Sequence, residues 1–181
     1  APDFVAAEPE AAPEPLRFGK FQLVEELSRS PNSVVYRAVQ DDFHGRDVAV
    51  KVLVEPPLDQ QEDGDDRVTR FRREVENIAR LRHPNIVSVY EVGEIDGFTY
   101  FSMEYVPGKT VEQLIDENGP FEITEAVSIL IQMVRAIRYY KDYDIVHRDI
   151  KPSNIIVTRQ SVAKLGDFGF VKSKLDKELG Y

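Results

Sequence analysis

The sequence lacks cysteine and tryptophan, and it holds only two methionines among 181 residues. Without cysteine the chain has no disulfide, no thiolate metal site and no thiol redox centre, which is typical of proteins from reducing compartments. No apolar run approaches the ~20 residues that a membrane-spanning helix requires. We therefore expect no transmembrane segment in this chain.

Positive charge is also scarce. Lys and Arg number 23 against 32 Asp and Glu, which gives a formal net charge of −9. Nucleic-acid backbones and anionic lipids would be repelled by such a chain, so broad binding to nucleic acid or to membrane surfaces is excluded. The segment 55–66 holds six carboxylates and no cation. We interpret it as a solvated loop, with a docking role as the alternative.

The first residues have little hydrophobic content. Residues 1–15 are mainly Ala, Pro and Glu, and such a composition buries too little apolar surface to offset the entropy lost on ordering. We predict a disordered linker over 1–16. Apolar residues make up 42% of the whole chain, which is enough to build a core in the remainder.

A small sheet with one helix is predicted between residues 17 and 104. Short loops separate the apolar runs, as in an antiparallel meander, and one stretch has the three- and four-residue spacing of a helix. The predicted strands are 21–24, 34–39, 47–54, 86–92 and 98–103, and the predicted helix is 67–82.

The pattern becomes helical after residues 104–108. Thr110 is a suitable N-cap for a helix over 111–117, which the residues 118–120 end. A longer helix is predicted at 124–143, and two short strands at 155–157 and 162–165 follow it. The apolar stripe of the longer helix is formed by Val127, Ile131, Val134 and Ile137. We therefore place a second, mainly helical unit at 105–181.

The most informative stretch is His-Arg-Asp-Ile-Lys-Pro-Ser-Asn at 147–154, with Asp-Phe-Gly at 167–169. Asp149 and Asn154 bracket a short loop that leads into a predicted buried strand, and Asp167 follows the next strand. Alone, Asp-Phe-Gly would be read as a turn in which glycine takes a positive φ. Together, the two motifs set three acidic or amide oxygens and one cation, Lys151, at fixed spacing, which few chemistries require.

The two motifs resemble the catalytic loop and the metal-binding motif of eukaryotic-like (Hanks-type) serine/threonine protein kinases, with some likeness to bacterial members. The resemblance implies an α+β bilobal fold, with a complete five-stranded N-lobe and its helix C at 17–104 and the first part of the C-lobe at 105–181. It also implies that Asp149 and Lys151 are catalytic and that Asn154 and Asp167 bind Mg²⁺.

The same resemblance extends to the predicted small lobe. Lys51 lies in the strongly apolar strand Val-Ala-Val-Lys, where a buried ammonium would need a counter-charge. Alone, this lysine would be read as a surface side chain. Glu74 lies beside the apolar stripe of the predicted helix, and the pair is similar to the lysine and glutamate with which kinases hold the ATP phosphates.

The resemblance further implies an ATP site between the lobes. Met103 would limit access behind the adenine, although an apolar strand would otherwise hold it as ordinary core. The backbone of Glu104 and Val106 would hydrogen-bond the base. The implied nucleotide-binding residues are Leu27, Ser28, Ser30, Ser33, Val35, Ala49, Lys51, Met103, Glu104, Val106 and Ile156.

The main departure from the family lies in the glycine-rich loop. Ser28, Ser30 and Ser33 stand at its three glycine positions. A side chain there would cost ~1 kcal/mol wherever φ is positive, and Pro31 stiffens the tip. Serine is still small, and its hydroxyl could donate to phosphate. We expect weakened nucleotide affinity rather than its loss.

The expected function is transfer of phosphate from ATP, with Mg²⁺, to serine or threonine hydroxyls of proteins. This part of the protein is expected to lie in the cytoplasm, either in a cytoplasmic protein or as the cytoplasmic part of a longer membrane-anchored protein. This chain ends before an activation segment, so it is expected to be inactive alone. The alternatives are a pseudokinase scaffold, favoured by the serine-substituted loop, and a small-molecule phosphotransferase of the same fold.

Overall fold

The computed structural model describes residues 16–43, 45–54, 79–143, 145–147, 149–166 and 172–173. The predictions for the linker before residue 16, for the acidic segment and for most of the helix at 67–82 lie outside these residues. Glu74 and Asp167 also lie outside them. Within the described part of the chain, no helix is long and apolar enough to cross a membrane.

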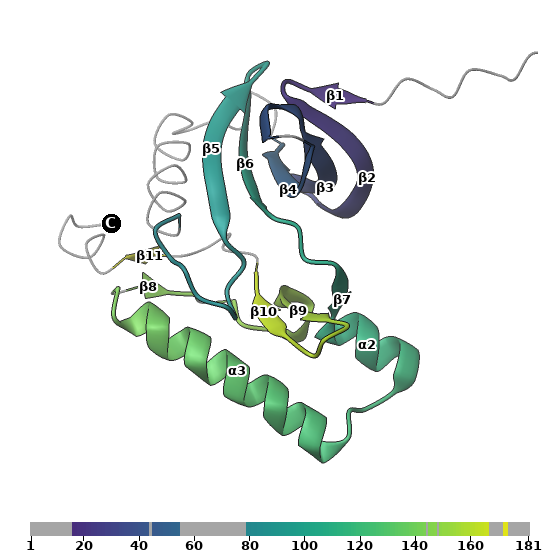
Figure 1. The fold of residues 1–181 in the computed structure, drawn as a ribbon, viewed down its shortest axis with the longest axis vertical. Coiled ribbons are helices and arrows are strands. Elements are labelled where there is room, and N and C mark those ends of the chain that lie inside the picture. The colour runs from purple at the N-terminus through teal and green to yellow at the C-terminus, as the bar shows by residue number, and fades with distance from the viewer. Residues whose placement is uncertain are drawn as a thin grey trace, which may run out of the picture.

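The small lobe is one antiparallel sheet with the strand order β1-β2-β3-β4-β6-β5 (Figure 1). All five predicted strands are present, and a sixth, β1, is added because Gly19 adopts φ +54° in the turn that folds it onto β2. The strands are β1 (Arg17–Phe18), β2 (Phe21–Ser30), β3 (Ser33–Gln40), β4 (Arg46–Leu53), β5 (Val89–Ile95) and β6 (Phe98–Glu104). A short 3-10 helix, η1 (Asp41–Phe43), precedes β4.

Two predicted boundaries in this lobe are wrong. The strand expected from residue 86 begins only at Val89, because the preceding residues bond to the other lobe: Val87 N–H donates to the carbonyl of Leu165, and Leu165 N–H donates to that of Asn85. Residues 79–82, expected to be the end of a helix, form a turn and an irregular segment.

The sheet has a closed core of its own. The central strand β4 is buried on both faces, as its continuous apolar pattern predicts. Tyr100 packs edge-on against Phe18 and Phe21, with ring centroids 5.6 and 5.3 Å apart. The buried residues of this cluster are Phe21, Ala38, Val48, Val50 and Tyr100.

The other lobe is built on two helices and short strands. The helix α2 (Val111–Asn118) begins at the predicted N-cap, where Thr110 and Gln113 form a reciprocal capping box. The long helix α3 (Ile123–Lys141) is close to its predicted extent. The remaining elements are β7 (Gly108–Thr110), β8 (Ile145–Val146), η3 (Pro152–Asn154), β9 (Ile155–Thr158), β10 (Ala163–Leu165) and β11 (Lys172–Ser173). They pair as β10-β9-β7 and β11-β8.

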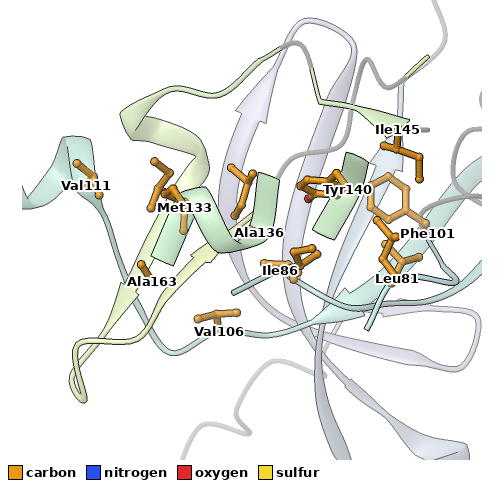
Figure 2. Close-up of a cluster of buried hydrophobic side chains, with 14 residues drawn as sticks. Leu81, Ile86, Phe101, Val106, Val111, Met133, Ala136, Tyr140, Ile145 and Ala163 are labelled. Carbon is orange, nitrogen blue, oxygen red and sulfur yellow. The ribbon is translucent and has the colours of Figure 1, made fainter. Parts of the chain in front are cut away.

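Helix α3 carries apolar residues on two faces, and only one face is covered. Met133, Ala136 and Tyr140 are buried in the larger core, together with Ile86 and Phe101 (Figure 2). The stripe expected from the sequence lies on the other face and is exposed in this structure. Its large exposed residues are Ile123, Val127, Leu130, Ile131, Val134 and Ile137.

Candidate functional site

Lys51 is positioned by the centre of the small-lobe sheet. It lies on β4 opposite Val35 of β3 and Phe101 of β6, and only 9% of its surface is exposed. Its ammonium is 6.0 Å from the centre of the Phe101 ring. The predicted pairing with Glu74 stays a prediction, because that residue lies outside the described part of the chain.

The loop before β9 brings Asp149, Lys151 and Asn154 together. Lys151 Nζ lies 2.9 Å from Asp149 Oδ2, and Asn154 Nδ2 donates to the same oxygen at 3.0 Å and to the Asp149 carbonyl at 2.8 Å. The hydrogen bond from Lys151, followed by that from Asn154, holds the pKa of the Asp149 carboxyl below its ordinary value. Asp149 is therefore held as a carboxylate with fixed orientation.

The short turn η3 creates this geometry. Lys151 is extended, and Pro152 begins the 3-10 helix with a φ that its ring already fixes. Asn154 ends the turn and is buried. This places its amide five residues after Asp149 but within hydrogen-bonding distance of it.

The amide oxygen of Asn154 is the type of ligand that a hard cation such as Mg²⁺ prefers. Its amide nitrogen is committed to Asp149, which leaves the amide oxygen as the atom that can bind Mg²⁺. The second expected ligand, Asp167, lies outside the described residues. Among the residues that the structure describes, no group of three or more acidic or histidine side chains forms a separate metal site.

His147 connects this loop to the residue before Asp167. The Asp149 N–H donates to its Nδ1 at 3.3 Å, so Nε2 carries the proton and donates to the Gly166 carbonyl at 3.1 Å. Gly166 N–H donates in turn to the Asn154 carbonyl at 2.8 Å. Gly166 is thus held through both its carbonyl and its N–H, a role that the sequence analysis missed.

A buried polar cluster joins the segment before β5 to the large lobe. Asn85 Nδ2 donates to Gln132 Oε1 at 2.8 Å and to the Ala163 carbonyl at 2.9 Å. The Ala163 N–H donates to the same Gln132 oxygen at 2.8 Å. These bonds connect α3, β10 and the Asn85 segment, and no motif in the sequence indicates them because the partners lie 31 to 78 positions apart.

The expected adenine-binding residues lie where β6 leaves the sheet. Ala49 is opposite Met103 in the β4–β6 ladder, and Val106 is buried three residues further on. Glu104 donates its N–H to the Ser88 carbonyl at 2.8 Å. Its carboxylate lies 2.9 Å from Lys164 Nζ on β10, so it also connects the two lobes.

The other predicted nucleotide contacts lie on separate elements. Val35 is next to Lys51 in the sheet, whereas Ile156 is on β9, opposite Thr110 of β7. Leu27 lies on β2 and is 42% exposed. The sheet therefore brings Val35, Ala49, Lys51 and Met103 to neighbouring strands.

The serine-substituted loop does not carry the expected backbone penalty. Among the described residues, the only non-glycine residues with positive φ are Asp96 and Ser161. Ser28, Ser30 and Ser33 therefore adopt backbone angles that any residue tolerates. In this conformation the cost assigned to their side chains is absent.

Comparison with known proteins agrees with this arrangement. The model of the protein kinase domain family matches residues 21–178. The serine/threonine-protein kinase PrkC of Bacillus subtilis is 40% identical over 151 residues, which are 83% of this chain and 22% of PrkC. A probable serine/threonine-protein kinase of Clostridium acetobutylicum is 39% identical over 154 residues, which are 85% of this chain and 23% of that protein. The chain thus spans under a quarter of the length of these relatives.

Solved structures show the same fold. The crystal structure of the Mycobacterium tuberculosis PknI kinase domain matches with a TM-score of 0.72 and 30% sequence identity, and covers 88% of this chain and 62% of that one. A point mutant of the same domain gives a TM-score of 0.70. The structure is therefore the N-terminal part of a protein-kinase fold, and the chain belongs to the protein kinase domain family.

Proposed function

We propose that the protein carrying this chain transfers the γ-phosphoryl group of ATP to serine or threonine hydroxyls of proteins. The observation that carries the proposal is the cluster of Asp149, Lys151 and Asn154, in which an ionised carboxylate is oriented by a cation and an amide. Phosphoryl transfer depends on positioning and charge neutralisation, which this set supplies.

In this proposal Asp149 orients the substrate hydroxyl and accepts its proton. Its lowered pKa keeps the carboxyl ionised at neutral pH, and the Asn154 amide holds the plane of the carboxylate. Lys151, 2.9 Å away, offsets negative charge that develops on the transferred group.

Asn154 and Asp167 are the proposed ligands of Mg²⁺. The ion, when bound, neutralises charge on the phosphates. His147 and Asn154 hold Gly166, the residue before Asp167. They therefore fix the point from which the chain continues to Asp167, the second proposed ligand.

ATP itself is proposed to bind between the sheet and β9. Lys51, with Glu74, would hold the α- and β-phosphates, and the backbone of Glu104 and Val106 would hydrogen-bond the adenine. Ala49 and Ile156 would contact its two faces, and Ala49 is buried at that point of the sheet.

The test compares wild-type full-length protein with Asp149→Asn. Asp149→Asn keeps the shape of the side chain but removes the base, so we expect phosphate transfer to a protein substrate to fall about 10²- to 10⁴-fold. Stabilisation by Mg-ATP in thermal unfolding should persist. Asp116→Asn, an exposed change on α2, is the matched control.

Three other outcomes would separate the candidate functions. Full activity in Asp149→Asn would contradict the proposed base. Binding of Mg-ATP by wild-type protein without transfer to any protein, itself included, would favour the scaffold. Transfer only to small molecules would favour the third function.

A further inference from the structure

The tip of the β2–β3 hairpin is closed by a serine side chain. Pro31 and Asn32 form its two-residue turn, and Ser30 and Ser33 are the pair that flanks it. Ser33 N–H donates to Ser30 Oγ at 3.1 Å, and the same hydroxyl lies 3.0 Å from Ser33 Oγ and 3.2 Å from the Ser33 carbonyl. A hydroxyl has one proton to donate, so the turn uses both its accepting and its donating capacity.

The backbone explains why a side chain takes this part. Tight hairpins favour turns with positive φ, and the β5–β6 hairpin follows that rule with Asp96 at φ 52° and Gly97 at φ 81°. Neither Pro31 nor Asn32 has a positive φ. The Ser30 hydroxyl therefore supplies hydrogen bonds to a turn whose backbone is not of the favoured type.

The same tip offers few donors to an anion. Consecutive backbone N–H groups are the usual phosphate contacts of such loops. Pro31 has no N–H, and the N–H of Ser33, a buried residue, is directed to Ser30. The Asn32 carbonyl is held by Val54 N–H at 2.9 Å, which fixes the turn to the end of β4.

We propose that Ser30 is a positioning residue that keeps the phosphate-binding tip closed on itself. A triphosphate then competes with the Ser30 hydroxyl for the Ser33 N–H, so Ser30 lowers affinity for the phosphates without affecting the nucleoside. This inference rests on the proposed ATP site. It predicts that removing the hydroxyl strengthens nucleotide binding, the opposite of a serine that donates to phosphate.

The test measures dissociation constants of the full-length protein by calorimetry for two probes: the Mg²⁺ complex of β,γ-imido-ATP, and adenosine. In Ser30→Ala the ATP analogue should bind about 2- to 10-fold more tightly, the range expected for one neutral hydrogen bond, while adenosine binding stays unchanged. Ser30→Thr retains the hydroxyl and should restore wild-type affinity.

Thr158→Ala is the matched control. Thr158 Oγ1 also accepts a backbone N–H, that of Val162 at 3.2 Å, in the turn between β9 and β10. Its loss removes the same kind of bond at another hairpin and should leave both dissociation constants unchanged.

Hydrogen exchange in the nucleotide-free protein gives a second readout. The Ser33 amide should exchange faster in Ser30→Ala and at the wild-type rate in Ser30→Thr. Weaker or unchanged analogue binding in Ser30→Ala, with adenosine still bound, would overturn the role of Ser30 alone. If neither probe bound the wild-type protein, both the ATP site and the role of Ser30 would be refuted.

Discussion

Lys51 and Asp149 are held in place by different forces. Lys51 belongs to a regular strand that is paired on both sides, and the register of β3, β4 and β6 sets its position. Asp149 lies outside any helix or strand. Its position depends on the hydrogen bond that its N–H donates to His147, on the one that its carboxylate accepts from Asn154, and on the Lys151 ammonium.

This difference has a consequence for mutation. A strand position survives the loss of one side chain, because many backbone bonds and apolar contacts remain. A loop position loses a large share of its constraints with each bond removed, since buried polar groups left unpaired add their own cost. Function and stability should therefore separate at Lys51 and remain coupled around Asp149.

The largest expected effect is loss of activity in Lys51→Met. Methionine keeps the apolar contacts of the strand, but it leaves the proposed partner Glu74 without a counter-charge, so the protein should still fold with a free energy of unfolding lower by about 1 to 3 kcal/mol. Phosphate transfer should fall at least about 100-fold, because the substitution removes the charge that we propose holds the phosphates. Urea unfolding and phosphate transfer by the full-length protein measure the two quantities.

Lys109→Met provides the comparison for this substitution. Lys109 is an exposed lysine paired with Glu117, and its loss should change neither quantity. A Lys51→Met protein that stayed active, or that failed to fold, would contradict the proposed separation of function from stability.

Next in size is Asn85→Ala, which breaks the polar cluster between the lobes. It leaves the Ala163 carbonyl without its side-chain donor and removes one of the two donors to Gln132 Oε1, and we expect a loss of about 2 to 3 kcal/mol in the free energy of unfolding. Asn118→Ala removes one bond, to the Leu114 carbonyl, at an exposed site. Its loss should cost below about 1 kcal/mol, and equal losses in the two variants would refute a special role for the cluster.

The small lobe was predictable from sequence because its strands are local patterns. The apolar run around Lys51 identifies β4, and Asp96–Gly97 identifies the β5–β6 turn. The extra strand β1 and the late start of β5 were not predictable. The β1 pairing is local but only two residues long, which is too short to give a periodic pattern. The late start of β5 depends on a residue distant in the chain, because Ile86 forms its bridge with Leu165 instead of entering the sheet.

The apolar period of α3 shows why a helix can be predicted while its buried face cannot. Val127, Ile131 and Val134 follow the expected spacing but are exposed. Met133, Ala136 and Tyr140 follow an equally good spacing and are buried. Sequence periodicity identifies amphipathic faces, and the choice between two apolar faces is made by the tertiary partners.

The motifs predicted which residue types form the candidate site, but they did not predict the hydrogen bonds and ion pairs that position them. Asp149, Lys151 and Asn154 were expected and lie together. The use of His147 to hold Gly166, and of Glu104 to pair with Lys164, depends on distances between segments. Spacing along the chain does not contain such distances.

A smaller effect is expected on titration of the loop. The hydrogen bond from Lys151 lowers the pKa of Asp149. The ionised carboxylate, and the stability that it contributes, are therefore present at neutral pH and are lost as pH falls through that lowered pKa. In Lys151→Met the pKa should rise toward its ordinary value. The acidic limb of the pH–rate profile should then shift to higher pH. An unshifted limb would show that Lys151 does not lower the pKa of Asp149.

The smallest expected effect lies back in the sheet. The Ser102 hydroxyl on β6 is fully buried and has no hydrogen-bond partner among the described residues. Ser102→Ala removes an unsatisfied polar atom and should stabilise the fold by about 1 kcal/mol. Thr158→Ala, whose hydroxyl is bonded, should instead destabilise it slightly. Thermal unfolding of both variants measures the two effects. If Ser102→Ala did not stabilise the protein, the sheet would tolerate the unpaired Ser102 hydroxyl at no cost, and the expected difference between a packed strand and a hydrogen-bonded loop would be contradicted.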